Sequence, residues 1–272
     1  MSIFVVAPII IMVVYAFSTA AGDFTLENFA RMGTYTAVFT RSFKLAIIAT
    51  LIALLIGYPV SYMLSKEGPQ VQRIAMVLIM LPMWMNFLLR TYSWMSILEN
   101  NGLLNQLFQQ IGLIDLYNQI AMHFASDPAA YVPIDHFQMI GTQGAVVLGM
   151  VYNYLPFMIL PIYSVLVKLD HSLIEAARDL GASSVQVFRK VILPLSLPGV
   201  LSGITMVFVP SVSTFAISRL LGGGTQMMLG DLIEQQFLGG AYNTQLGAAI
   251  ALVMMAIVGV CMLVMNRFGD GE

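Results

Sequence analysis

Side chains able to carry out covalent or metal chemistry are scarce in this sequence. The single cysteine, Cys261, lies in an apolar run, and His123 and His136 stand apart without further metal ligands around them. No glycine-rich phosphate-binding motif ending in Gly-Lys-Ser/Thr occurs, so we do not expect this chain to hydrolyse ATP. The apolar segments also lack the His/Asp/Glu cluster or Ser/His pair that a membrane-embedded enzyme would need. The sequence therefore predicts no catalytic residue, no metal site and no cofactor.

The most informative spacing lies in a polar interruption, Lys168 to Pro194, between two long apolar segments. Ser172 and Glu175 have the S-x-x-E spacing of a capping box, which predicts a helix start there. The apolar residues that follow recur at intervals that place them on one helical face, namely Leu173, Ala176, Ala177 and Leu180.

The second half of this interruption carries the signals of a bend and a second helix. Gly181 follows the apolar face, and glycine tolerates the left-handed conformation in which helices often end. Ser183 and Gln186 repeat the capping spacing and predict a helix through Lys190. Pro194 has no backbone N–H, so it fits the first turn of the next helix or a kink in it.

The composition is that of a membrane protein. Hydrophobic residues make up 58% of the chain and charged residues only 10%, with a mean hydropathy of +0.84. Soluble proteins carry about 25% charged residues. At 272 residues the chain has the length for one transmembrane domain with short loops. We therefore predict an all-α polytopic fold with about six spans, at about 3–17, 45–64, 74–97, 145–166, 192–221 and 246–265.

Two segments between and before these spans carry further expectations. The longest loop contains apolar residues spaced for one helix lying at the membrane surface, namely Leu103, Leu104, Leu107, Phe108 and Ile111. No lysine or arginine precedes the first span, which therefore lacks the charged start of a secretory signal. We expect the natural start of this span to lie upstream.

Positive charge predicts the orientation, because loops on the cytoplasmic side carry an excess of lysine and arginine. With the polar interruption inside, seven of the twelve Lys and Arg lie inside, namely Lys66, Arg73, Lys168, Arg178, Arg189, Lys190 and Arg267. Both termini are then cytoplasmic, and the chain is a multi-pass protein of the cell membrane. The net charge of −2 gives no indication of nucleic-acid binding.

Residues 168–194 resemble the EAA loop of ABC importer permeases and are called the EAA-like loop below. The matching positions are Glu175, Ala176, Ala177, Gly181, Leu193 and Pro194, while Val191 stands where isoleucine is usual. The resemblance implies the type I ABC importer permease fold and docking of this loop into a groove on a cytoplasmic ATPase. Alternatively, the loop is an ordinary capped hairpin in which Glu175 serves only its own helix.

A second resemblance narrows the family. The run LPMWMNFLLRTYSWMSIL, residues 81–98, is similar to the third span of spermidine/putrescine permeases, and LVKLDHSLIEAARDLGAS, PLSLPGVLSG and GDLIEQQFL fit the same group. The likeness implies import by alternating access, together with a second permease subunit, two ATPase subunits and an external polyamine-binding protein. A permease of the same family for an opine, thiamine or a metal complex is the nearest alternative. An ATPase-independent channel or scaffold is a more distant one.

A passage for a polycation should offer carboxylates, carbonyls and aromatic faces. The candidates for such a path are Trp84, Asn86, Tyr92, Tyr152, Asp231 and Glu234. Interfacial anchoring or packing is the favoured explanation of the aromatic residues, and a solvated loop is the favoured explanation of the two acids. Arg90 and Arg219 have the wrong sign for a cation ligand, so we expect each to reach the interface or to pair with a carboxylate.

Overall fold

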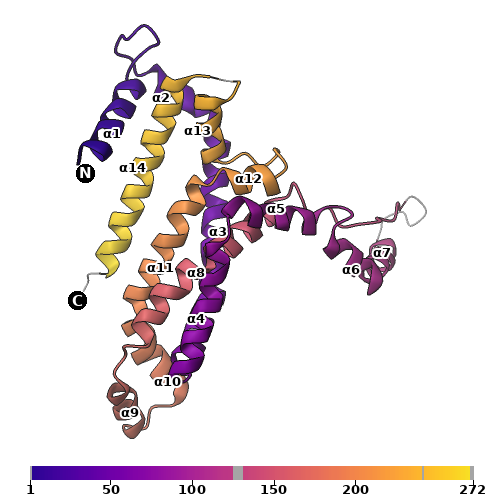
Figure 1. Ribbon diagram of the computed structural model, residues 1–272, viewed down its shortest axis with the longest axis vertical. Coiled ribbons are helices and arrows are strands. Elements are labelled where there is room, and N and C mark those ends of the chain that lie inside the picture. Colours follow the sequence, from indigo (N-terminus) through magenta and orange to yellow (C-terminus); the bar gives the residue numbers. More distant parts are fainter. Residues whose placement is uncertain (1, 125–130, 241, 270–272) are drawn as a thin grey trace.

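The computed structural model describes residues 2–124, 131–240 and 242–269. These residues are almost entirely helical and contain no β-strand, although one isolated bridge pairs Ser18 with Phe24. The predicted all-α fold is therefore confirmed. Figure 1 shows an upright bundle of helices and an arm that projects from its side.

Three long helices form the centre of the bundle. They are α3 (Thr36–Ser65), α8 (Gln143–Leu166) and α11 (Leu193–Ser213), and each packs against the other two. At one edge of the bundle, α14 (Thr244–Gly269) packs against α11 and against the short N-terminal helix α1 (Ser2–Ala16) (Figure 1). Apolar residues on all sides of these helices are expected for segments surrounded by lipid and by one another.

Small residues allow the central helices to approach closely. A Cβ atom on Gly203 of α11 would lie 2.8 Å from the Met158 sulfur, and one on Gly57 of α3 would lie 2.9 Å from Met158 Cγ. The hydroxyl of Ser61 crosses the contact between α3 and α8 and donates to the Ile159 carbonyl at 3.1 Å. Such small residues and interhelical hydrogen bonds are typical of helix packing within membranes.

Among the described residues, four stretches are long and apolar enough to cross a membrane, namely Glu27–Ser65, Gln143–Leu166, Ser184–Ser213 and Thr244–Met265. The pair Pro69–Trp84 and Phe87–Gln110 gives a fifth if it acts as one span, and α1 contains a shorter apolar stretch, Val6–Ala16. The predicted number of about six spans agrees roughly with these helices. Several of the predicted boundaries do not.

The predicted third span, 74–97, is not one continuous helix. It is divided between α4 (Pro69–Trp84) and α5 (Phe87–Leu98), and the direction of the chain changes there by 90°. Met85 is extended, and the side chain of Asn86 accepts a hydrogen bond from the Leu88 N–H at 2.8 Å, so a new helix begins. The correction follows from Asn86, whose capping role outweighs the continuous apolar pattern around it.

The predicted fifth span, 192–221, is also divided. Helix α11 ends at Ser213 because Thr214 has an extended backbone, and the short helix α12 (Ala216–Leu221) follows in a new direction. The hydroxyl of Ser213 donates a hydrogen bond to the Val209 carbonyl at 3.2 Å, within the last turn of α11. A span-length apolar run therefore contains a helix end that periodicity alone does not reveal.

The arm that projects from the side of the bundle, called the outer arm below, consists of α6 (Leu103–Gln110), α7 (Leu113–Phe124) and the returning segment 131–137. Two asparagine side chains bind the returning segment. Each side-chain amide bonds both the N–H and the carbonyl of one residue, as a peptide group of a neighbouring strand would. Asn105 bonds both the carbonyl and the N–H of Phe137 at 3.0 Å, and Asn118 bonds those of Ile134 at 2.9 and 3.0 Å. The arm is therefore fastened by amide hydrogen bonds.

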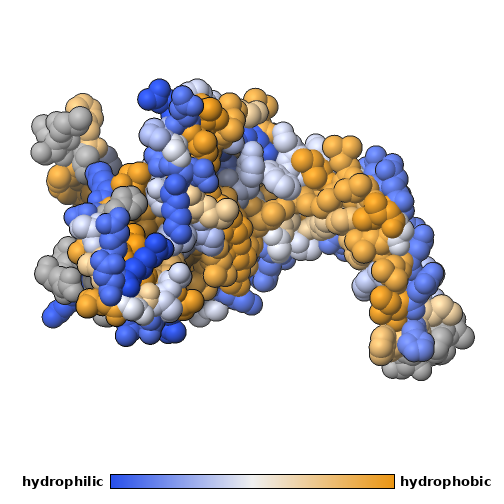
Figure 2. Space-filling view, turned by 90° about the horizontal axis from the view of Figure 1, so that it is seen from below, coloured by the Kyte–Doolittle hydropathy of each residue, from blue (hydrophilic) through white to orange (hydrophobic). Residues whose placement is uncertain are grey.

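The apolar side chains of the outer arm remain largely exposed. Leu103, Ile111 and Phe124 are 68%, 64% and 82% exposed. Figure 2 shows hydrophobic atoms along much of the arm's underside, the face turned toward the end of the bundle that carries α9 (His171–Asp179) and α10 (Ser184–Val187). This agrees with an arm that lies along the membrane surface, the position predicted for its first helix.

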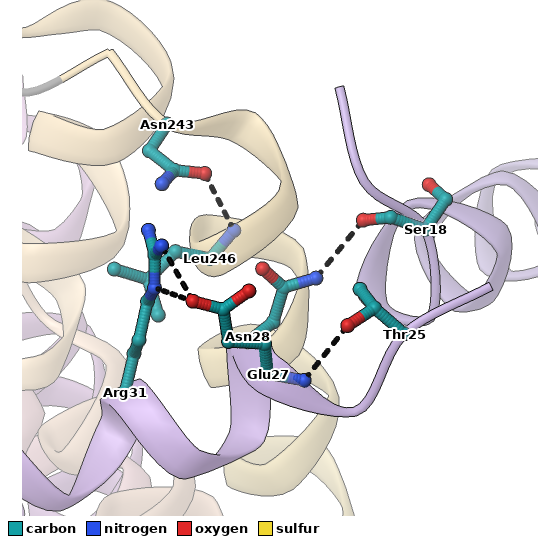
Figure 3. Close-up of polar contacts among 7 residues, drawn as sticks. All are labelled: Ser18, Thr25, Glu27, Asn28, Arg31, Asn243 and Leu246. Atoms are coloured by element: carbon teal, nitrogen blue, oxygen red, sulfur yellow. Dashed lines mark hydrogen bonds and ion pairs between the residues drawn. The ribbon is translucent and has the colours of Figure 1, made fainter. Parts of the chain in front are cut away.

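At the opposite end from the EAA-like loop, polar residues tie the N-terminal segment to α2 (Glu27–Arg31) (Figure 3). The buried side-chain amide of Asn28 donates to the carbonyls of Ala16 and Ser18, both at 3.0 Å. Glu27 forms an ion pair with Arg31 at 2.7 Å. The two bonds from Asn28 link the end of α1 to the start of the long helix stretch, whereas the ion pair lies within α2.

Helix α13 (Leu229–Leu238) lies at this same end and is joined directly to α3. The Leu229 N–H donates to the hydroxyl of Ser42 at 2.8 Å, and both residues are buried. The hydrogen bond satisfies one of the free donors in the first turn of α13. Helix α3 thus connects α13 to the opposite end of the bundle.

Candidate functional site

The EAA-like loop contains two short helices, as its spacing predicts, but the first begins differently. Helix α9 (His171–Asp179) is capped by Asp170, whose side chain accepts a hydrogen bond from the Ser172 N–H at 2.9 Å. The predicted capping box of Ser172 and Glu175 is therefore wrong. Asp170 stands two residues earlier and places its carboxylate at the positive end of the helix, where an acid is favoured.

The bend after α9 follows the prediction for Gly181. This residue has φ +81°, which is the left-handed conformation. The Ala182 N–H donates to the Ala177 carbonyl at 3.1 Å, and the Gly181 N–H donates to the Arg178 carbonyl at 2.8 Å. This pattern is the Schellman arrangement that satisfies carbonyls at a helix end.

The second helix of the loop begins as predicted. Helix α10 (Ser184–Val187) has a complete capping box, in which Ser183 and Gln186 exchange backbone and side-chain hydrogen bonds. A turn of wider π-helix, Phe188–Ile192, then leads directly into α11, with Pro194 in its first turn. Such π turns occur frequently at functional sites, and the spacing of residues in the loop does not predict this one.

One side of the EAA-like loop is anchored to the bundle. Val187 and Ile192 are 2% and 4% exposed and belong to a hydrophobic cluster with residues of α8 and α11. Phe188 meets the rings of Tyr58 and Tyr62, at centroid distances of 5.9 and 5.5 Å. The loop is therefore held on a rigid support.

The other side of the loop is exposed. Leu173, Leu180 and Val185 are 47%, 89% and 66% exposed, and these three residues are called the loop patch below. Glu175 is exposed on α9 as well. Of the remaining positions that match the EAA pattern, Ala176, Leu193 and Pro194 are exposed, whereas Ala177 is half-buried. The loop thus exposes a carboxylate and three large apolar side chains on the side away from its buried residues.

The aromatic residues proposed for a cation path lie in different surroundings. Trp84 and Tyr92 are 76% and 46% exposed, on either side of the break between α4 and α5. Tyr152 packs edge-on against Trp94 at 5.3 Å. Asn86 caps α5, as described above. These residues thus have different surroundings, and their role in a path stays a prediction.

Asp231 and Glu234 both have partners on α12. Glu234 forms an ion pair with Arg219, so the pairing expected for that arginine is confirmed. Asp231 is only 4% exposed and accepts hydrogen bonds from the Ser218 hydroxyl and from the Met228 N–H at 3.0 Å. Burial raises the pKa of Asp231 above its ordinary value, although the bond from Ser218 opposes this shift.

Arg90 differs from Arg219. It is 8% exposed, and its Nε and Nη1 atoms have no hydrogen-bond partner among the described residues. No carboxylate of the described residues forms an ion pair with Arg90, so the pairing expected for this arginine is not found. A cation in this position repels another cation, which argues against a direct contact between Arg90 and a polyamine.

The fold is that of ABC importer permeases. A solved structure of a bacterial ABC transporter that imports alginate matches with a TM-score of 0.72 at 17% identity, over 98% of this chain and 90% of that one. The structure of the MetNI methionine ABC transporter matches with a TM-score of 0.62 at 18% identity, over 89% of this chain and 97% of that one.

Curated relatives are closer in sequence. The spermidine/putrescine transport system permease protein PotB of Escherichia coli (strain K12) is 36% identical over 246 residues, which are 90% of this chain and 82% of the relative. PotB of Haemophilus influenzae is 35% identical over 272 residues, 97% of this chain and 88% of the relative. The family model for the binding-protein-dependent transport system inner membrane component matches residues 49–270. The chain therefore belongs to this family, the permease subunits of ABC importers.

Proposed function

We propose that this chain is a permease subunit that carries spermidine or putrescine inward across the cell membrane by alternating access. The observation that carries the proposal is the identity of more than a third to permeases named for these two polyamines, extending over most of both chains. Relatives of this kind are transport components, and we propose that separate subunits hydrolyse the ATP. We include a second permease subunit, two ATPase subunits and an external polyamine-binding protein in the complex.

The geometry of the EAA-like loop supports its role as the ATPase contact. Its anchored side, Val187 and Ile192, is buried in the bundle, while the loop patch points away from it. An exposed apolar surface on a rigid support is what a groove on a partner can bury, and fully burying one leucine contributes roughly 1.5–3 kcal/mol. Glu175 lies on the same exposed helix and supplies a charge that can select the orientation of docking.

This role fixes the orientation of the chain. The EAA-like loop faces the cytoplasm, together with both termini, and α2 and α13 face the outside. In this orientation the outer arm lies on the external side, where the apolar underside meets the lipid surface. The ion pair of Glu234 with Arg219 then lies where the binding protein would dock.

The path for the solute is less defined than the coupling contact. Glu234 is neutralised by Arg219, and Asp231 is buried, so neither offers a free carboxylate to an arriving cation in this conformation. We propose that the exposed faces of Trp84 and Tyr92 contribute cation–π contacts once the second permease closes the path. Most of the selectivity would then come from the binding protein.

The test is the ATPase activity of the complete complex reconstituted in liposomes. The binding protein is added without ligand and then loaded with spermidine or putrescine. We expect the loaded forms to stimulate ATP hydrolysis and to drive accumulation of radiolabelled polyamine inside the liposomes. Stimulation by an opine, thiamine or a metal complex, with no response to polyamines, would retain the importer and refute the substrate.

A further inference from the structure

A cavity of about 240 Å³ lies where the EAA-like loop meets the end of α3. Its lining includes Ser65, the last residue of α3, the following Lys66, Arg178 from α9 and Ser184 from α10. The cavity thus joins the end of α3 to two neighbouring helices of the EAA-like loop, which lie far from α3 in the sequence. Two cationic groups and two hydroxyl groups line the same small space.

The charges in this cavity are not balanced. Its lining contains no carboxylate among the described residues. Among all the described residues, the ion pairs are Glu27 with Arg31 and Glu234 with Arg219. Neither pair includes Lys66 or Arg178. Two like charges that share a cavity repel each other, so an anion placed between them is favoured.

The position of Lys66 is fixed by an aromatic ring. Its ammonium group lies 3.8 Å from the centroid of Tyr62, one turn earlier on α3. This cation–π contact limits the freedom of the lysine side chain and keeps its charge beside the cavity. Tyr62 also contacts Phe188 of the loop, so the same ring links the cavity to the anchored side of the EAA-like loop.

The position of the cavity along α3 indicates where a bound anion would come from. The helix is apolar up to Met63 and Leu64, and the polar residues Ser65 and Lys66 end it. The exposed Met63, at 68%, marks the last lipid-facing turn before them. Basic pockets at this level bind the phosphate groups of lipids.

From these observations we infer that the cavity between α3 and the EAA-like loop is a phosphate-binding site. Lys66 and Arg178 hold the anionic oxygens, and the hydroxyl groups of Ser65 and Ser184 donate further hydrogen bonds. The ligand is the phosphate of an anionic phospholipid headgroup or free phosphate. A bound phosphate would join α3 to α9 and stiffen the mounting of the loop, a consequence for coupling that rests on the proposed function.

The binding itself is tested without the ATPase. The purified full-length chain in a non-ionic detergent is titrated with short-chain phosphatidylglycerol, short-chain phosphatidylcholine or inorganic phosphate at constant ionic strength. Thermal unfolding gives an apparent Kd for each probe, because a ligand that binds only the folded state raises its stability. We expect saturable stabilisation by phosphatidylglycerol and none by phosphatidylcholine.

Two double variants of equal charge distinguish the cavity from the general positive surface. Lys66→Gln with Arg178→Gln should weaken binding at least about tenfold, because both charge-assisted contacts are lost. Arg189→Gln with Lys190→Gln removes two exposed charges of the same loop outside the cavity and should change the Kd less than about twofold. Lys66→Arg, which keeps the charge, should retain most of the binding.

The probes also separate the two sources of phosphate. Stabilisation by phosphatidylglycerol alone assigns the site to a lipid headgroup, and competition by inorganic phosphate in the millimolar range assigns it to free phosphate. Both results support the inference. Stabilisation by neither probe, or equal weakening by the two double variants, would overturn it while leaving the proposed transport function untouched.

Discussion

Leu180 offers a direct test of the EAA-like loop as an ATPase contact. It is 89% exposed at the end of α9 and makes no contribution to a hydrophobic cluster among the described residues. Substitution by alanine should therefore change the free energy of unfolding by less than about 0.5 kcal/mol. Burial of a leucine in a partner's groove contributes about 1.5–3 kcal/mol, so its loss should weaken ATPase binding roughly 10- to 140-fold.

The assay measures the affinity of the purified ATPase for the two permease subunits in detergent, by an immobilised-ligand binding method. The matched control is Leu238→Ala, because Leu238 is 82% exposed on α13 at the opposite end of the bundle. We expect ATPase affinity to be unchanged in this control. Equal affinities for the Leu180→Ala and Leu238→Ala proteins would refute the reasoning that the loop patch docks into the ATPase.

Three further predictions concern backbone, packing and charge. Gly181→Val should distort the bend after α9, because a left-handed φ of +81° costs a side-chain residue about 1–2 kcal/mol, and ATPase affinity should fall while the chain still inserts. Gly203→Ala should lower the free energy of unfolding by about 1–3 kcal/mol, because the new Cβ would lie 2.8 Å from the Met158 sulfur. Asp231→Asn should remove a pH dependence. A raised pKa means that the contribution of Asp231 to stability is largest below its ordinary value of 3.8 and declines as the pH rises through the raised value, so thermal unfolding of the variant should vary less between about pH 4 and pH 7.

Each of these three predictions has a control. Gly33→Val and Gly259→Ala place side chains where no atom lies within 4 Å and φ is not positive, so they should be tolerated. If Gly33→Val reduced ATPase affinity as much as Gly181→Val, the left-handed bend would not be the cause. Equal destabilisation by the two alanine variants would contradict the close packing at Met158, and identical pH profiles for wild type and Asp231→Asn would contradict the raised pKa.

Local signals in the sequence predicted much of the EAA-like loop. Gly181 and the pair Ser183 and Gln186 act through neighbours only one to five residues away, so their conformations depend little on the rest of the fold. The cap of α9 was misassigned because two polar residues compete for one position. Asp170 prevails over Ser172, and nothing in the S-x-x-E spacing ranks them.

The boundaries of the spans were harder to predict. Asn86 caps a new helix inside an apolar run, and Thr214 ends α11 within a segment long enough to cross the membrane. Composition reports the length of an apolar segment but not the direction of the chain within it. The cavity beside Lys66 and Arg178 could not be predicted at all, because these residues are 112 positions apart in sequence and meet only through the packing of the loop on α3.

The length of α3 has a mechanical consequence. Its 30 residues make a helix about 45 Å long, whereas the hydrocarbon layer is about 30 Å thick. Near one end, the hydroxyl of Ser42 holds α13, and near the other, Tyr62 meets the EAA-like loop. These contacts lie about 30 Å apart along the helix, so a rotation of roughly 5° about one of them would displace the other by about 3 Å. Pro59 removes one backbone hydrogen bond just before Tyr62, and bending of α3 under load would therefore concentrate next to the loop.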